Sequence, residues 1–305
     1  MAYRLKSGKL TGKALRKVNV EQAESALEAL SKEAVLPADI HESRKAVKRV
    51  RSLLKLLEPA LSAGTFRDRY KGIGKAADLL AGARDLHVLE ATLDKLEQRF
   101  GNDIKPVAEA VRAMVEAEAP SSAPRLSPKD LEHAKQIFAR EARKLAKLHV
   151  QGEGFELIGA GLEETYRTAK KNFALAYRRP SDERFHELRK AVQWHWRHMV
   201  LLSRCWPEYF ALRVEACREL AECLGDDHDL AVLLEVVRRH PDQAVRTKAE
   251  KAARVRQKEL RGEAFAVAER LFAESPKAFA RRMASYWACK AALPVRTEKL
   301  PAKAE

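Results

Sequence analysis

Apolar residues recur at helical spacing along nearly the whole chain of 305 residues, and no segment shows the strict alternation of a half-buried strand. We therefore expect an all-α fold. Breaks are predicted at the Pro-rich segment 120–128 and at the Gly-containing segment 151–154. The expected helices are roughly Val20–Glu33, Pro37–Leu57, Ser62–Leu80, Asp85–Phe100, Ile104–Glu118, Pro128–His149, Phe155–Arg178, Ser181–Arg204, Pro207–Leu224, Asp229–His240, Asp242–Glu274 and Pro276–Ala291.

An internal repeat underlies this pattern. Residues 41–47 read His-Glu-Ser-Arg-Lys-Ala-Val, and residues 186–192 read His-Glu-Leu-Arg-Lys-Ala-Val, an offset of 145. A second pair, at 84–89 and 228–233, shares Asp-Leu and Val-Leu at an offset of 144, as do Arg69 and Arg213. Two motifs at nearly one offset predict two copies of one helical unit within a single domain over 1–305. The copies would cover about 1–150 and 151–293, with 294–305 a frayed tail.

Cationic residues gather on one face of the helix expected over Pro37–Leu57. At 3.6 residues per turn this face contains His41, Arg44, Lys45, Lys48, Ser52 and Lys55, with Arg51 at its edge. Apolar residues form the opposite face, which we expect to pack in the core. Like charges at this spacing repel one another by a few tenths of a kcal/mol per pair, a cost that a phosphate ligand would remove.

The second copy has a similar but less regular face. It contains His186, Arg189, Lys190, Arg197 and Arg204, with Gln193 at the position of Lys48. Trp194 and Trp196 flank it. His195 and His198 lie toward the apolar side, where we expect them to be packed and hydrogen-bonded rather than bound to a ligand.

The preceding helix of the second copy adds Arg167, Lys170 and Lys171 at helical spacing. Its first-copy counterpart has Glu21, Glu24 and Glu28 instead. We therefore expect a basic groove to which the two copies contribute unequally.

Composition and charge narrow the function. The chain is 33% charged and has 58 Lys and Arg against 43 Asp and Glu, a formal net charge of +15. Such a surplus is typical of proteins that bind nucleic acid, an anionic membrane surface or another polyanion. The four cysteines form no Cys-x-x-Cys pair, and no apolar stretch has the length of a signal peptide core or a membrane span. We expect free thiols and a cytoplasmic protein that does not insert into a membrane.

The two His-x-x-Arg-Lys helices, each followed by an Asp-Leu helix start, resemble the CHAD family, the conserved histidine α-helical domain. The resemblance covers about Leu5 to Arg282 and implies two pseudo-symmetric antiparallel helical bundles with a basic groove or pore between them. It also implies binding of inorganic polyphosphate and association with polyphosphate granules. The positions matching the family motifs are His41, Arg44, Lys45, Lys48, Arg51, Arg84, His186, Arg189, Lys190, Arg197 and His228. No Glu-x-Glu-x-Lys motif of the triphosphate tunnel domain, to which some members are fused, occurs here.

Other functions stay open. Residues 225–229, Gly-Asp-Asp-His-Asp, could hold a metal for phosphohydrolysis. The first copy reads Ala-Gly-Ala-Arg-Asp there, and one of the aspartates can instead cap a helix. RNA or a general polyanion would also suit the charge, although no nucleic-acid-binding motif is evident. We expect a non-enzymatic polyphosphate-binding protein without a metal or cofactor, and its oligomeric state is left open.

Overall fold

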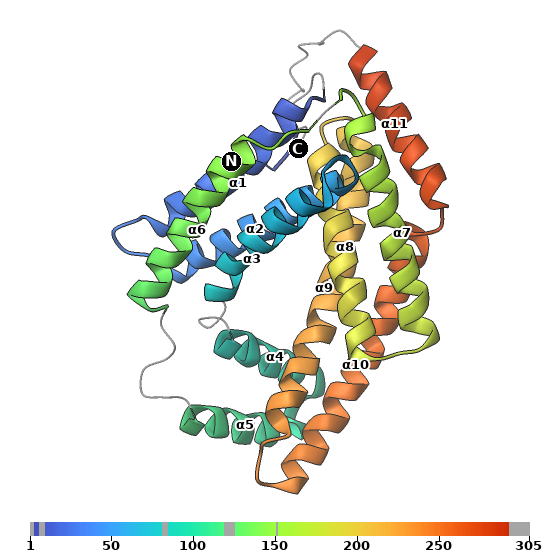
Figure 1. The fold of residues 1–305 in the computed structure, drawn as a ribbon. Coiled ribbons are helices and arrows are strands. Elements are labelled where there is room, and N and C mark those ends of the chain that lie inside the picture. The colour runs from blue at the N-terminus through green and yellow to red at the C-terminus, as the bar shows by residue number, and fades with distance from the viewer. Residues whose placement is uncertain (1–2, 6–9, 81–84, 119–125, 151, 293–305) are drawn as a thin grey trace, which may run out of the picture.

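A computed structural model describes residues 3–5, 10–80, 85–118, 126–150 and 152–292. Within these ranges the chain is all-α and has no named strand, which confirms the predicted fold class (Figure 1). The helices are α1 (Gly12–Leu30), α2 (Pro37–Leu57), α3 (Ala63–Leu79), α4 (Asp85–Phe100), α5 (Lys105–Glu118), α6 (Pro128–Ala146), α7 (Glu156–Arg178), α8 (Asp182–Leu202), α9 (Pro207–Val237), α10 (Gln243–Leu271) and α11 (Pro276–Ala292). Two short 3-10 helices, η1 (Glu58–Ala60) and η2 (Gly101–Asp103), follow α2 and α4.

Helices α1, α2, α3 and α6 pack together as one group. Helices α7, α8, α9, α10 and α11 form a second group, and α2 joins the two by packing on α7 and α8. At Gly161 of α7 a Cβ atom would lie 1.8 Å from the carbonyl oxygen of Leu56, so the absence of a side chain permits this close approach. The expected break before α7 is confirmed, because Gly152 and Gly154 have positive φ angles there.

The core is divided between two apolar clusters. The larger cluster draws on α1, α2, α3, α6, α7, α8, α11, the first part of α9 and the end of α10. The smaller one joins α4 and α5 to the end of α9 and the middle of α10 (Figure 1). Burial therefore crosses the boundary between the two sequence halves, since α4 and α5 lie in the first half and α9 and α10 in the second.

Helix α9 differs from the sequence prediction. Two helices were expected, with a break at residues 225–228, but one continuous helix spans Pro207–Val237. The aspartates of this segment have partners on other helices: Asp226 Oδ1 lies 2.7 Å from Lys95 Nζ of α4, and Asp227 Oδ1 lies 2.6 Å from Arg261 Nε of α10. Because these tertiary contacts satisfy the carboxylates, they cap no helix and the backbone continues through them.

Two further expectations concerned membrane-spanning helices and the C-terminal tail. No helix within the described ranges combines the length and apolarity required to cross a bilayer. The predicted tail at 294–305 lies outside the described residues, as does Arg84.

Candidate functional site

The helices α2 and α8 cross near their C-terminal ends. His198 Nε2 lies 2.9 Å from the carbonyl oxygen of Ser52, and the Ser52 hydroxyl donates to the carbonyl of Trp194 at 3.4 Å. From this crossing the N-terminal parts of the two helices, which carry the His-x-x-Arg-Lys motifs, diverge (Figure 1). The two motifs therefore lie where α2 and α8 are apart, and the contact between the C-terminal parts of the two helices fixes their relative position.

Buried histidines support this crossing, as their sequence pattern indicates. His195 and His198 are fully buried. His198 Nδ1 lies 3.3 Å from the Thr165 hydroxyl, and His195 Nε2 lies 3.2 Å from Arg213. Burial lowers the pKa of His198 to about 4, with a further contribution from Arg197. Both rings are hydrogen-bonded in the interior, which agrees with the expectation for them.

Two arginines of α2 face α3 and the residue that follows it. Arg44 Nη1 donates to the carbonyl of Leu80 at 2.5 Å. The Arg51 guanidinium lies 4.1 Å from the centre of the Tyr70 ring, and its Nε is buried without a hydrogen-bond partner. These two side chains are therefore part of the contact between α2 and α3.

Lys55 lies where α2, α3 and α8 meet. Its ammonium pairs with Glu58 and lies 5.4 Å from the centre of the Phe66 ring and 5.5 Å from that of Trp194. The indole face of Trp194 is thus close to a cation of this chain.

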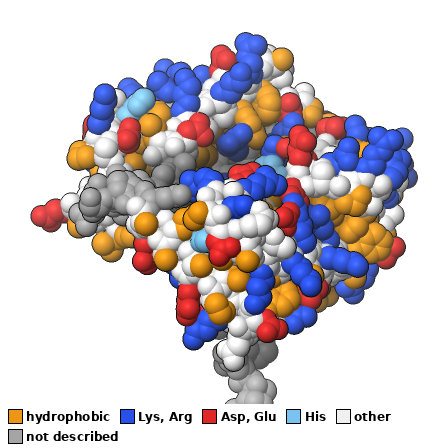
Figure 2. All heavy atoms as spheres, turned by 90° about the horizontal axis from the view of Figure 1, so that it is seen from below, with side chains coloured by type: hydrophobic (Ala, Val, Ile, Leu, Met, Phe, Trp, Pro, Cys, Tyr) orange, Lys and Arg blue, Asp and Glu red, His pale blue; other side chains and the backbone are white. Residues whose placement is uncertain are grey.

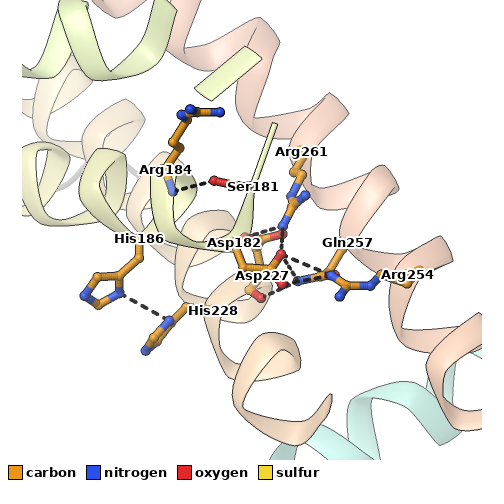
Figure 3. A network of polar contacts seen from close by, with 9 residues as sticks. All are labelled: Ser181, Asp182, Arg184, His186, Asp227, His228, Arg254, Gln257 and Arg261. Carbon is orange, nitrogen blue, oxygen red and sulfur yellow. Dashed lines mark hydrogen bonds and ion pairs between the residues drawn. The ribbon is translucent and has the colours of Figure 1, made fainter. Parts of the chain in front are cut away.

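A second group of cations follows α8. His186 Nδ1 lies 3.2 Å from His228 Nδ1 of α9 (Figure 3). Burial, repulsion from Lys190 and repulsion from Arg189 lower the pKa of His186. Farther along α8, burial lowers the pKa of Arg197 to about 10, and repulsion from Arg49 and Arg189 contributes. We call this series, His228, His186, Arg189, Arg197 and Arg49, the cationic track.

Arg49 belongs to this track although it was not among the residues predicted from the sequence. It donates to Gln22 Oε1 of α1 at 3.1 Å, and its positive charge helps to lower the pKa of Arg197. Its position four residues after Lys45 offered a signal, but its approach to Arg197 depends on the crossing of α2 and α8. Among the described residues, no carboxylate lies within ion-pair distance of Arg49, Arg51 or Arg197.

The lysines of the two motifs occupy the surface in matching ways. Lys45 pairs with Glu42 at 2.7 Å, and Lys190 pairs with Glu187 at 2.8 Å. His41 is exposed, whereas Lys48 is half-buried.

The remaining predicted residues lie elsewhere. On α7, Lys170 donates to the carbonyls of Ala273 and Glu274 after α10, and Arg167 pairs with Glu163 and Glu164 of its own helix. Lys171 and Arg204 are exposed, and Arg204 follows the C-terminal end of α8, at the other end of that helix from His186. The structure thus gives Lys170 a capping role and does not bring it together with the cationic track.

The aspartates near His228 form an ion-pair network rather than a metal centre. Asp182 of α8 and Asp227 of α9 both face α10, where Arg261 contacts the two carboxylates at 2.6 Å and Arg254 contacts Asp182 at 2.9 Å (Figure 3). Gln257 donates to the Asp227 carbonyl at 3.1 Å. Within the described ranges, no group of three or more His, Cys, Asp or Glu side chains is arranged to hold a metal ion.

The surface is strongly cationic. Figure 2, which views the molecule from below, shows Lys and Arg side chains bordering a hollow near the centre of this face, with Asp and Glu side chains between them. This mixture agrees with the many ion pairs that the described side chains form, such as those of Arg112 with Glu90, Asp94 and Glu97.

Comparisons with known proteins agree with this architecture. Residues 19–238 match the CHAD domain. The fold is similar to the crystal structure of the CHAD domain from the plant Ricinus communis, with a TM-score of 0.53 and 18% identity over 93% of this chain and 96% of that one. It is also similar to PptA from Streptomyces chartreusis, with a TM-score of 0.52 and 16% identity over 90% of this chain and 99% of that one. No curated protein matches the sequence.

Proposed function

The chain belongs to the CHAD family, and from that premise we propose that it binds inorganic polyphosphate along the cationic track without acting on it chemically. CHAD domains are linked to polyphosphate binding. In the cell this activity would place the protein on polyphosphate granules.

The observation that carries the proposal is a pair of half-buried arginines, Arg49 and Arg197, that have no described carboxylate within ion-pair distance. Arg49 and Arg197 repel each other across the crossing of α2 and α8. Removing a charge from water is costly unless an opposite charge compensates for it. An anion that runs along the track would supply this compensation, and a guanidinium can donate two parallel hydrogen bonds to one phosphate group.

The aromatic residues favour a bare phosphate chain over nucleic acid. Proteins that bind single strands present aromatic faces on which bases stack. Here Lys55 lies near the Trp194 ring, Arg51 covers Tyr70, and the Trp196 nitrogen is buried without a partner. Rings already covered by cations of the same chain offer little room for bases.

A competition titration tests the proposal. Long-chain polyphosphate would compete with single-stranded RNA and duplex DNA of matched charge for the full chain at near-physiological salt. We expect polyphosphate to be preferred, and the double substitution Arg49→Gln/Arg197→Gln to weaken its binding about a hundredfold, because each guanidinium contributes about 1.5 kcal/mol through charge-assisted hydrogen bonds.

The matched control is Lys251→Ala/Lys258→Ala, which removes two exposed charges from α10. It should weaken binding only slightly, because these lysines lie on a helix that contributes nothing to the track. Melting curves of both variants control for folding, because Arg49→Gln/Arg197→Gln gives up the hydrogen bonds to Gln22 and to the Gln193 carbonyl. Equal losses in the two variants, or tighter binding of RNA, would contradict the proposal.

A further inference from the structure

A cationic cavity distinct from the cationic track lies at the end of the first helical group, where η1 connects α2 to α3. Its volume is about 560 Å³. The polar part of its wall is formed by Ser62, Thr65, Arg69, Lys144, Lys147 and His149. Arg69, although the sequence repeat singled it out, is not part of the cationic track.

The charge of this cavity is unbalanced. Its wall contains three permanently cationic side chains and no Asp or Glu. Glu141 lies behind it, only 2% exposed, and contacts Arg69 Nη1 at 2.7 Å, Arg140 Nε at 3.4 Å and Lys144 Nζ at 3.9 Å. One buried carboxylate among three cations leaves a net positive field at the cavity.

The same carboxylate fixes the orientation of Arg69, whose side chain is only 14% exposed. A Cβ atom at residue 72 would lie 2.7 Å from Glu141 Oε1, so Gly72 gives the carboxylate room to reach α3. Arg69 has further N–H groups to donate while it is paired, because a guanidinium has five. The geometry therefore holds one planar donor in place beside two mobile lysines.

The other prominent cavity lacks this property. It has a volume of about 370 Å³ between α4, α9 and α10 and is lined by both signs of charge. Lys95 there is 2.7 Å from Asp226, and Arg99 and Arg256 both pair with Glu259. Paired charges leave little field for a free anion.

The second half of the chain has different side chains at the positions that correspond to this cavity. At an offset of 144, Ser62 and Thr65 correspond to Trp206 and Tyr209. Those rings pack on Tyr286, each with centroids 5.0 Å apart. Arg213, the counterpart of Arg69, turns to the carbonyl of Leu271 at 3.0 Å. Aromatic rings and a backbone carbonyl thus take up in the second half the positions that line the cavity in the first.

We propose that this cavity binds a short oligophosphate, of the size of pyrophosphate or tripolyphosphate, either free or as the terminal groups of a longer phosphate chain. Arg69 would contact one phosphate group bidentately, and Lys144 and Lys147 would neutralise the others. The apolar side chains of the wall are aliphatic, Ala60, Leu61 and Leu148, and no described Phe, Tyr or Trp side chain lines the cavity as a surface on which a base could stack. This site is separate from the cationic track and does not depend on the proposed function.

Calorimetric titration of the full chain with sodium tripolyphosphate tests the site. Two variants remove it in different ways: Lys144→Ala/Lys147→Ala deletes charge, and Thr65→Tyr introduces the aromatic residue of the second half without changing charge. Each should weaken tripolyphosphate binding about tenfold or more, as expected for the loss of one or two charge-assisted contacts. Lys251→Ala/Lys258→Ala controls for net charge, and melting curves control for folding.

The track variant Arg49→Gln/Arg197→Gln separates this proposal from the preceding one. It should retain tripolyphosphate binding at the cavity even if it loses long-chain polyphosphate. Competition by long chains with free ends but not by chains with amine-blocked ends would identify a chain terminus as the ligand, and competition by neither would identify free oligophosphate. Folded cavity variants that bind tripolyphosphate as the unsubstituted protein does would overturn the proposal.

Discussion

Helices α2 and α8 carry the same motif but use their cations differently. In α2, Arg44 donates to the carbonyl that follows α3, and Arg51 covers an aromatic ring of α3. In α8, Arg197 is close enough to Arg189 of the same helix and to Arg49 of α2 for both charges to lower its pKa. The helix with more cations thus uses two of its arginines to pack on α3, whereas the less cationic helix supplies more of the track.

The difference arises at the crossing itself. An offset of 145 makes Ser52 of α2 the counterpart of Arg197 of α8. Ser52 donates to the carbonyl of Trp194 at the crossing, whereas Arg197 adds a cation there. It also pairs Leu53 with His198 and Val50 with His195. Where α2 presents aliphatic side chains to the core, α8 presents buried imidazoles. The second copy therefore has two pH-sensitive groups in the core where the first copy has aliphatic side chains.

The largest effect expected from this difference concerns stability in acid. The pKa of His198 falls from an ordinary value of 6.5 to about 4 in the folded protein because the ring is buried. The unfolded chain therefore takes up a proton first, and the stabilisation present above about pH 6.5 is lost as the pH falls toward 4. We expect the free energy of unfolding in urea to drop by about 2 kcal/mol between pH 7 and pH 5 through His198 alone, and further through the similarly buried His195, whose pKa is also lowered by burial.

Replacing His198→Leu, which copies Leu53 of the first helix, sharpens this test. The variant should be less stable at pH 7 by about 1–3 kcal/mol, because the buried carbonyl of Ser52 loses its donor. Its stability should also depend less on pH, with the remaining dependence due to His195. His133→Leu, at an exposed position of α6, should change neither property. An unchanged pH dependence in His198→Leu would show that other groups control acid unfolding.

The helical fold could be predicted because helix periodicity is a local property of the sequence. The break expected at 225–228 was wrong because Gly225, Asp226 and Asp227 resemble a helix end, and nothing local reveals that Lys95 and Arg261 satisfy the two carboxylates. Such partners come from other helices and override the local preference.

The candidate site could be predicted only in part for the same reason. Helical spacing correctly identified which residues share a face, such as Arg189 and Arg197. It could not show that Arg44 meets the end of α3, or that Lys170 meets the end of α10, because those contacts depend on how helices pack. Arg49 lies beside the predicted cationic face of α2, and it belongs to the track only because the crossing of α2 and α8 brings it near Arg197.

A smaller effect concerns the pH dependence of polyphosphate binding. His186 has a lowered pKa in the free protein because of burial and its neighbours Lys190 and Arg189, with Glu187 acting in the opposite direction. A bound polyanion stabilises the protonated ring, so binding should take up a proton and tighten severalfold as the pH falls from about 8 to about 6. Titrations at several pH values in buffers of different ionisation enthalpy would measure both the affinity and the proton uptake.

Substitution His228→Arg tests the origin of this effect, because arginine occupies the corresponding position, Arg84, in the first copy. A permanent charge beside His186 should make binding tighter at pH 8 and reduce its pH dependence. His133→Arg, at an exposed position of α6 outside both proposed sites, should preserve the pH dependence of the long-chain affinity. If His228→Arg retained the full pH dependence, the paired imidazoles would not be its source.

The smallest effect expected follows from Gln193, which replaces the lysine found at Lys48 of α2. Its carbonyl accepts from Arg197 Nη1 at 2.8 Å, and it lies one turn from both Arg189 and Arg197. Gln193→Lys would add a cation within the track, destabilising the free protein by a few tenths of a kcal/mol through repulsion at i±4 spacing. Polyphosphate should bind severalfold more tightly and with a steeper salt dependence, because an added phosphate contact releases about one more counterion. Gln136→Lys adds the same charge to an exposed position of α6 and controls for net charge. A larger gain for Gln193→Lys would show that the weaker basic face of α8 limits affinity, whereas equal gains would mean that total charge, and not the arrangement along α8, determines binding.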